Sequence, residues 1–537
     1  MQGHYILLAL GAIALYFLYQ QVFAKKETRP LPPGPKPVPL VGNIKDLPVH
    51  GELESLHWLQ LKDKYGPVSS ITILGQTLVI IHDKDAAIEL LEKRSVQTSG
   101  RPVMEFAFNL CGLSGFLSSQ QNNATLRKYR KFVHQEFGTK SATASFNKIQ
   151  LLESSKLISR LLEKPDNLDS NLRSFAGSVI LKITYGYSAD TQAPDPLISL
   201  IERVALNISK MLVAGAWFVD VIPVLRYVPS WCPGAGFKRT AAKWKKMLHA
   251  VVDLPFSFTL EQMGSGNATP SYVSKLVQSL QSGDDLRLDD SDAHAIKWTA
   301  ANLYAAGADT TISTMRSVIL AMIMFPDVQR KAQEEIDKVT GGSRLPDFDD
   351  RDRLPYVNNL VQEALRWCPV APMGVPHRAD EDMSYNGYLI PKGSYLLPAA
   401  WWLCHDPAVY HDPDAFDPAR YSEPFNEPHP DFVFGFGRRK CPGLHLADAS
   451  LFIAIARMLS AFSVAKALDA NGQEVEVELR VKPGIVASPE DFQYRLTARS
   501  AELARAIREQ DLGTAEADSH AGLLQEPVSH FIELGDK

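Results

Sequence analysis

The sequence predicts a mainly α-helical protein with small β-sheets, an α+β fold, preceded by one N-terminal transmembrane helix. Three observations predict this fold class. Apolar segments with helical periodicity fill the middle of the chain. Short alternating segments bounded by glycine or proline, which are typical of strands, occur near the two ends of the body. An almost uncharged apolar run occupies residues 5–23.

The N-terminal run is long enough to cross a bilayer as a helix. A cleaved signal peptide is the alternative, but no Lys or Arg precedes the run and no small-residue cleavage site follows it. Lys25, Lys26 and Arg29 come next and place the body on the cytoplasmic side by the positive-inside rule. Prolines in residues 30–35 prevent the helix from continuing. We therefore expect residues 1–29 to be a retained anchor.

The body is expected to form one large domain over residues 30–500. No polar, repetitive or low-complexity linker divides the 537-residue chain. A net charge of -5 with 45% hydrophobic residues gives no indication of a nucleic-acid partner. The five cysteines lack the spacing of a disulfide framework, which is typical of a reducing compartment.

Strand patterns lie at both ends of this body. A helical pattern at residues 56–65 is followed by alternating segments at 68–74 and 77–81, which predict a hairpin. Residues 475–481 and 492–496 form a second β-rich region.

The longest predicted helix begins at a cap formed by Ser291 or Asp292 and ends at Phe325, before Pro326. It is too apolar for a solvated surface helix, so we expect it to run through the centre of the body. A further helix is predicted over residues 326–340.

Polar segments are expected to lie at the surface. Residues 264–270 and 282–290 have the composition of loops. Residues 501–537 are predicted to be a polar C-terminal tail, peripheral or partly disordered, to which we assign no function.

A single cysteine, Cys441, lies in a glycine-rich loop just before an apolar helical run. Positive side chains before it and backbone N–H groups would stabilise a thiolate. Gly437 and Gly443 would let the backbone approach a flat ligand closely. We expect an iron ligand; the alternative is a buried small hydrophobe, as most free cysteines are. A zinc site with Cys404, His405 and His445 is disfavoured because the chain has no close C-x-x-C pair.

The loop Phe434–Gly443 matches F-x-x-G-x-R-x-C-x-G at every fixed position, and so resembles the haem-binding signature of the cytochrome P450 monooxygenases. The resemblance implies the cytochrome P450 fold, with the long central helix over the haem. It also implies haem b (iron protoporphyrin IX) as the cofactor, Cys441 as the axial ligand of its iron, and contacts from Phe434, Gly437 and Gly443.

The similarity extends from Pro30 to about Ser500, and residues 374–378 and 390–393 look like the fungal O-methylsterigmatocystin oxidoreductase-like branch. The anchor and proline hinge resemble those of microsomal members. This implies a single-pass protein of the endoplasmic reticulum membrane, with its catalytic domain facing the cytoplasm.

Residues 306–311 place a glycine and two threonines in the middle of the long helix, where each weakens helical propensity. We expect the Thr310 hydroxyl to open the helical hydrogen-bond ladder and hold water, and Gly307 to leave room for a ligand. By resemblance, Thr310 would hydrogen-bond bound dioxygen and Asp309 would relay protons. The alternative is an ordinary kink with a solvated Asp309.

Glu363 and Arg366 are three residues apart on a predicted helix over residues 356–367, which alone is a weak signal. The family resemblance implies that Arg420 joins them. The three would form a buried structural network that holds the cysteine loop in place.

The family positions of Arg130, His377 and Arg439 imply pairing with the haem propionates. Leu126, one turn before Arg130, stands where the family usually has tryptophan. The basic residues near Arg130 and Cys441 form either a docking face for an acidic redox partner or a merely solvated surface.

The substrate pocket is placed by position in the family and is mostly apolar, which favours a hydrophobic substrate. Its predicted lining residues are Phe106, Phe108, Leu113, Asn302, Ala306, Val370, Val375 and Ile485. Residues 217–237 combine apolar side chains with Arg226 and nearby Lys238, which predicts either a membrane-dipping lid or a core segment.

Together the motifs indicate a haem-thiolate monooxygenase that inserts one oxygen atom from O₂ into a hydrophobic small molecule, in fungal secondary metabolism. The chain has no Gly-rich dinucleotide fingerprint, so electrons from NADPH would arrive through NADPH-cytochrome P450 reductase. Two alternatives remain: a reductase-independent haem-thiolate isomerase or dehydratase, and a non-catalytic haem or hydrophobe carrier at the membrane.

Overall fold

The structure, a computed structural model, describes residues 29–49, 51–190, 193–213, 215–280, 288–513 and 519–536. The predicted membrane span and most of the predicted loop at 282–290 lie outside these residues. The chain forms two compact units, each built from discontinuous segments. The first unit takes Met1–Pro102 as far as it is described, Met373–Ala399 and Phe436–Arg438; the second takes Val103–Pro372, Ala400–Gly435 and Arg439–Lys537.

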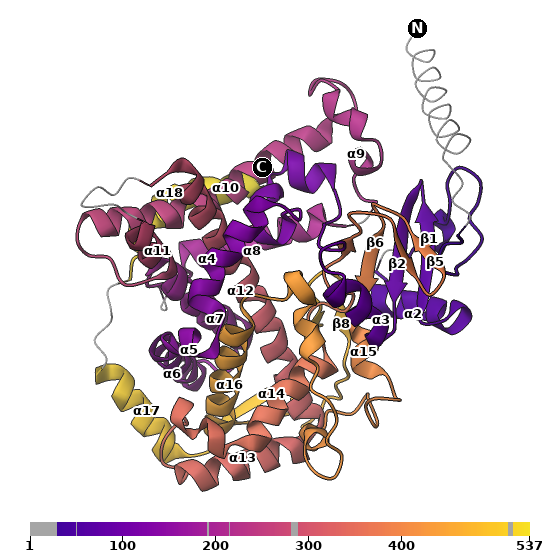
Figure 1. Ribbon diagram of the computed structural model, residues 1–537. Coiled ribbons are helices and arrows are strands. Elements are labelled where there is room, and N and C mark those ends of the chain that lie inside the picture. Colours follow the sequence, from indigo (N-terminus) through magenta and orange to yellow (C-terminus); the bar gives the residue numbers. More distant parts are fainter. Residues whose placement is uncertain are drawn as a thin grey trace. The chain divides into compact units, whose positions relative to one another are not determined.

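A four-stranded sheet in the order β1-β2-β6-β3 forms the centre of the first unit (Figure 1). The predicted hairpin is confirmed, with Val68 opposite Ile81 in antiparallel β1 and β2. Strand β6 then pairs parallel to β2 although it lies more than 300 residues later in the chain. The elements are α2 (Glu54–Tyr65), β1 (Val68–Ile73), β2 (Gln76–Ile81), α3 (Lys84–Ala87), β3 (His377–Arg378), β4 (Met383–Tyr385), β5 (Tyr388–Ile390) and β6 (Tyr395–Pro398).

The second unit is mostly helical. Its helices are α4 (Ala124–Phe137), α5 (Lys140–Ala144), α6 (Asn147–Glu163), α7 (Leu168–Tyr185), α8 (Pro196–Met211), α9 (Phe218–Val221), α10 (Gly236–Gly264), α11 (Tyr272–Leu280), α12 (Asp290–Met324), α13 (Pro326–Thr340), α14 (Pro355–Trp367), α15 (Ala400–His405), α16 (Leu444–Ala461), α17 (Ala501–Gly513) and α18 (Ala521–Asp536). Its strands are β7 (Phe462–Ala465), β8 (Val481–Lys482), β9 (Ser488–Pro489) and β10 (Arg495–Ala498).

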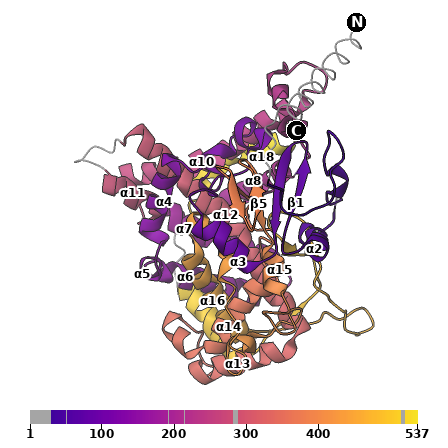
Figure 2. The same cartoon turned by 45° about the vertical axis from the view of Figure 1, so that its right-hand side comes forward.

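Helix α12 is the predicted central helix, and its position is confirmed. It packs against α7, α10, α16 and α4, and both ribbon views show it among these helices (Figures 1 and 2). Its cap is Asp289, whose side chain accepts the Ser291 N–H, two residues before the predicted start. Most of its side chains from Ala295 to Ile323 are buried, as its apolar composition requires.

The second β-rich region differs from its prediction. Residues 475–480 form no strand; β10 pairs instead with β7, at the end of α16, and β8 pairs with β9. The alternation of side chains does not specify which strand pairs with which. Here the partner of β10 is β7, which follows α16 and lies about 30 residues earlier in the chain.

The segment after Ser500 is helical where the structure describes it, in contrast to the predicted peripheral tail. Helix α18 packs on α8 and α10, and Leu524 and Val528 are buried there. The sequence pattern is weak because Pro527 lies inside the helix.

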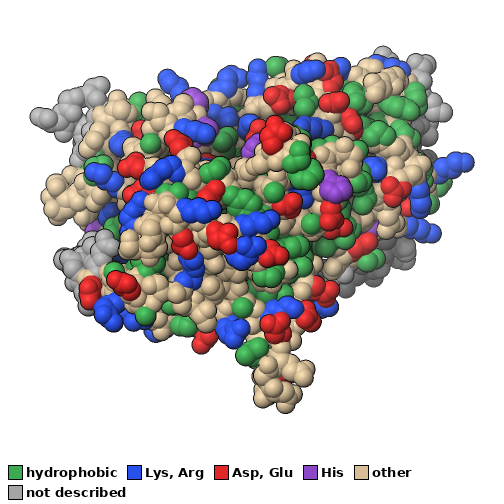
Figure 3. Space-filling view, turned by 90° about the horizontal axis from the view of Figure 1, so that it is seen from below, with side chains coloured by type: hydrophobic (Ala, Val, Ile, Leu, Met, Phe, Trp, Pro, Cys, Tyr) green, Lys and Arg blue, Asp and Glu red, His purple; other side chains and the backbone are tan. Residues whose placement is uncertain are grey.

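Among the described helices, α16 alone has the length and composition of a membrane span, and most of it is buried inside the protein. On the face shown in Figure 3, Lys and Arg side chains are interspersed with Asp and Glu, so no large patch of one sign is visible there.

Candidate active site

The loop that carries Cys441 is closed by backbone hydrogen bonds. The N–H of Cys441 donates to the carbonyl of Phe434 at 2.7 Å, and that of Gly435 donates to Phe432 at 2.8 Å. Gly435 has a φ of 84°, which favours glycine. Helix α16 begins at Leu444, directly after Gly443. The loop therefore presents a half-buried, free thiol just before the N-terminus of a helix.

Two arginines connect the Cys441 end of this loop to other segments of the second unit. Arg130 on α4 donates to the carbonyl of Lys440 at 3.0 Å, and the buried Arg439 donates to the carbonyl of Gln120. Burial raises the pKa of the Cys441 thiol, whereas the Gly443 N–H and the Arg130 charge oppose that rise. Positive charge is therefore placed where a thiolate needs it.

The donor set fits a haem group. Cys441 is a single thiol, and no group of three or more His, Cys, Asp or Glu side chains in the described chain could hold a metal ion. An iron held mainly by a porphyrin needs only this one protein ligand, whereas zinc needs three or four. A Cβ at Gly443 would lie 3.9 Å from the Cys441 sulfur, an ordinary van der Waals contact, so this glycine borders that atom.

Three predicted residues belong to the first unit. His377 is buried, and its Nδ1 donates to the carbonyl of Thr98 at 2.8 Å. Gly437 has a φ of 49°, and a Cβ there would lie 2.6 Å from the Leu91 carbonyl oxygen, so only glycine fits. Val375 is exposed, and its carbonyl accepts a hydrogen bond from Arg101 at 2.8 Å.

The threonines of α12 do not open the helix, so that prediction is wrong. The Thr310 hydroxyl donates to the carbonyl of Ala306 at 2.8 Å, within one uninterrupted helix. Gly307 makes room for a neighbouring helix, because a Cβ there would lie 3.1 Å from the Ile180 side chain of α7. Ala306 and Thr310 nonetheless keep part of their surface exposed.

Asp309 is half-buried on the same turn. Burial raises the pKa of its carboxyl group, the charge of Arg173 on α7 opposes the rise, and that of Glu202 on α8 adds to it. Asp309 therefore holds a proton more tightly than a solvated aspartate, which disfavours the alternative of a solvated side chain.

The structure brings Glu363, Arg366 and Arg420 together in a fully buried network. Glu363 accepts two hydrogen bonds from Arg366 at 2.8 Å each and one from Arg420 Nε at 3.0 Å. Arg366 also donates to the carbonyls of Cys404, Pro413 and Ala415. These contacts thus fix residues 404–427, which precede the cysteine loop.

Sequence reasoning missed two members of this network. The hydroxyl of Tyr421 donates to Glu363 at 2.9 Å, and Glu427 accepts from Arg420 at 2.7 Å. Tyr421 directly follows Arg420, so the motif itself offered a signal. Glu427 gave no signal in the sequence, because its contact with Arg420 depends on how the chain turns between these two residues.

The predicted pocket residues of the second unit differ from one another in burial and in contacts. Asn302 accepts the Ser118 N–H at 3.1 Å, and Leu113 is buried. Phe106 is fully buried by stacking on Trp217, with ring centroids 3.6 Å apart. Phe108 is half-buried, Val370 accepts the Ala487 N–H through its carbonyl at 2.8 Å, and Ile485 is exposed.

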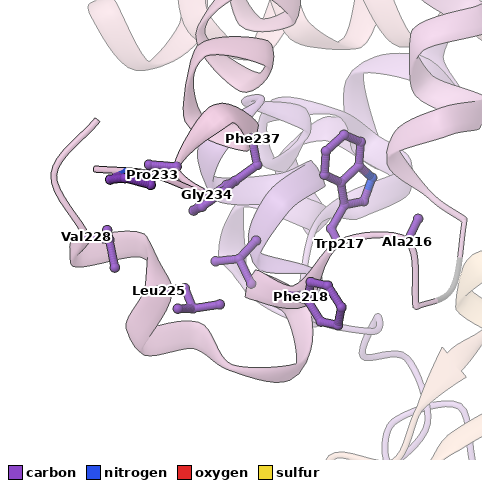
Figure 4. A pocket seen from close by; sticks show the side chains of 10 residues that line it. Ala216, Trp217, Phe218, Leu225, Val228, Pro233, Gly234 and Phe237 are labelled. Carbon is purple, nitrogen blue, oxygen red and sulfur yellow. The ribbon is translucent and has the colours of Figure 1, made fainter. Parts of the chain in front are cut away.

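An apolar cavity of about 290 Å³ lies in the segment between α8 and α10 (Figure 4). It is lined by Ala216, Trp217, Phe218, Val219, Leu225, Val228, Pro233, Gly234, Ala235 and Phe237. Phe218 and Trp231 of this segment are 77% and 81% exposed, which favours the predicted lid over a core segment.

Comparisons with known proteins agree with the fold class. The family model "Cytochrome P450" matches residues 32–494. The chain is 45% identical over 526 residues to the "Multifunctional cytochrome P450 monooxygenase af510" of Aspergillus fumigatus, covering 96% of this chain and 98% of the relative. It is 45% identical over 527 residues to the "Cytochrome P450 monooxygenase CLM2" of Gibberella zeae (97% and 99%). It is 35% identical over 512 residues to the "O-methylsterigmatocystin oxidoreductase" of Aspergillus flavus (94% and 95%).

The chain belongs to the cytochrome P450 family. The α+β fold of the body and the predicted resemblance to fungal members are confirmed, whereas the N-terminal transmembrane helix stays a prediction; the protein is an enzyme, a monooxygenase with haem as its cofactor. A non-catalytic carrier is thereby excluded.

Proposed function

We propose that the enzyme inserts one oxygen atom from O₂ into a hydrophobic small molecule in fungal secondary metabolism, with electrons from NADPH-cytochrome P450 reductase. The geometry of Cys441, one free thiol in a closed loop flanked by Arg130 and Arg439, carries the proposal. When bound, haem supplies the activation of oxygen at its iron. By their family positions, Arg130, His377 and Arg439 would pair with its carboxylates.

Thr310 and Asp309 are proposed to supply the protons that oxygen activation needs. The Thr310 hydroxyl keeps its lone pairs while it donates to Ala306, and rotation would turn its proton outward. Burial raises the pKa of Asp309, and a raised pKa suits a carboxyl group that acts as a proton donor. This pair supports oxygen insertion over a peroxide rearrangement, because a rearrangement needs no proton supply from solvent.

The basic side chains of α4 support the proposed reductase partner. Arg127 and Lys131 are exposed on α4, as is Lys440 beside the cysteine. Lys128 is paired with Asp292 at 2.7 Å and is therefore less suited to a partner. Acidic partners are attracted to such a cluster.

Membrane location is part of the proposal. The predicted anchor at residues 1–29 would hold the protein on the endoplasmic reticulum as a single-pass protein, with its catalytic domain in the cytoplasm. The exposed Phe218, Tyr227 and Trp231 support contact with a lipid surface, where aromatic side chains are favoured.

The test uses the full chain with reductase, NADPH and ¹⁸O₂, and apolar precursors whose products are analysed by mass. We expect a product that carries one heavy oxygen atom and forms only with NADPH. A product formed without reductase and without heavy oxygen would contradict the proposal and support an isomerase or dehydratase.

A further inference from the structure

The C-terminal helix α18 has one face buried in the second unit. It packs on α8 and α10, and the ribbon views show it beside them (Figures 1 and 2). Val528 on this face is 0% exposed, whereas Leu523 on the other side of the helix is 59% exposed. Burial of apolar side chains therefore fixes α18 across these two helices.

The start of α18 is fastened by His520. Its N–H donates to the Ser188 carbonyl at 2.9 Å, and its Nδ1 accepts the Ser188 N–H at 2.9 Å. Its ring lies 5.8 Å from that of Tyr187 and 4.9 Å from that of Phe258 on α10. The Tyr187 hydroxyl donates at 2.9 Å to Asp195, which caps α8. His520 is thus connected to both helices.

Helices α8 and α10 are joined by residues 212–235, here named the lid segment. The lid segment is held on the π-helical turn Glu105–Leu110 by few contacts. Asp220 accepts the Phe106 N–H at 2.7 Å, and Arg226 lies 3.3 Å from Glu105. Trp217 adds the stacking contact with Phe106. Much of the remaining lid surface is exposed, so the position of α8 and α10 decides where it lies.

We propose that α18 is a strap that holds α8 and α10 together and thereby keeps the lid segment on the Glu105–Leu110 turn. Release of the strap would leave α8 and α10 held only by their direct packing on each other, and the lid segment would open more often. The strap itself does not depend on the proposed function; only its consequence, faster exchange of apolar substrate past Phe106 and Phe108, rests on it.

Limited trypsin digestion of the full-length haem-loaded enzyme tests the strap, with cleavage after Arg226 compared with cleavage after Arg344 outside the lid segment. Val528→Asp places a charge in the buried face and should accelerate cleavage after Arg226 about 10-fold or more relative to Arg344. Leu523→Asp, on the exposed side of the same helix, is the matched control and should change nothing.

The proposal would be overturned if Val528→Asp left the ratio of cleavage rates after Arg226 and Arg344 unchanged. It would also be overturned if Leu523→Asp raised this ratio equally. If Val528→Asp fails to fold, His520→Ala decides, because it removes the hydrogen bond from the Ser188 N–H and the ring contacts but leaves the buried face of α18 unchanged. A rise of about 3-fold is expected for it, and no rise would overturn the proposal.

Discussion

Replacement of Glu363 by alanine would remove the centre of a buried charge network. Glu363 and Arg366 are 0% exposed, and the carboxylate accepts hydrogen bonds from both guanidinium groups, the Tyr421 hydroxyl and the Asp417 N–H. Without it, Arg366 and Arg420 keep their charges in a site closed to water. Breaking a buried pair in this way costs about 3–5 kcal/mol.

The free energy of unfolding is measured by urea denaturation, followed by tryptophan fluorescence. Trp367 contributes to this fluorescence from beside the network. Its Nε1 donates to the Asp414 carbonyl at 2.8 Å, inside the segment that the network fixes. Glu334→Ala is the matched control: Glu334 pairs with Arg330 at 2.7 Å on α13, but both side chains are more than half exposed. This control should lose at most about 0.5 kcal/mol. Equal losses in the two variants would refute the reasoning.

Three further outcomes are expected. Thr310→Ala should release several-fold more peroxide per NADPH consumed, measured against product; tight coupling would assign proton delivery to another group. Asp309→Asn should be more stable than the wild type at pH 7, since burial raises the pKa of Asp309 in the folded state, and the difference should shrink as the pH falls and the wild-type carboxyl takes up its proton; a constant difference in urea midpoints would contradict this. Hydrogen bonding by Arg344 lowers the pKa of Asp350 to about 2, so its contribution is present above pH 4 and lost as the pH falls towards 2. Asp350→Asn should therefore lose about 1–2 kcal/mol at pH 7 and little at pH 2, and equal losses at both would argue against the ion pair.

The local elements of this fold could be predicted from the sequence. Periodicity and helix stops defined α12, α13 and α14 to within two residues, and the β1–β2 hairpin followed from alternation. The pairing of β6 with β2 could not be predicted, because parallel pairing over 300 residues leaves no local pattern. Helix α18 was missed because Pro527 and polar side chains mask its apolar face.

The candidate site shows the same division. The signature around Cys441 and the spacing of Glu363, Arg366 and Arg420 point to residues that the structure places in the cysteine loop and in one buried network. Side-chain surroundings were less predictable: Gly307 was expected to face a ligand, yet Ile180 of another helix occupies that side. Phe106 was expected to line a pocket, yet Trp217 covers its ring. The first outcome depends on the packing of α7 against α12 and the second on the position of Trp217 between α8 and α10, and the sequence motif encodes neither.

The carbon monoxide difference spectrum of the reduced, haem-loaded enzyme tests the role of Cys441 most directly. Thiolate ligation gives the long-wavelength carbonyl band, and we expect this band in the wild type and its loss in Cys441→Ala. Cys404→Ala, at a buried cysteine outside the loop, should keep it. A band that survives in Cys441→Ala would contradict the assignment of this sulfur to the haem iron.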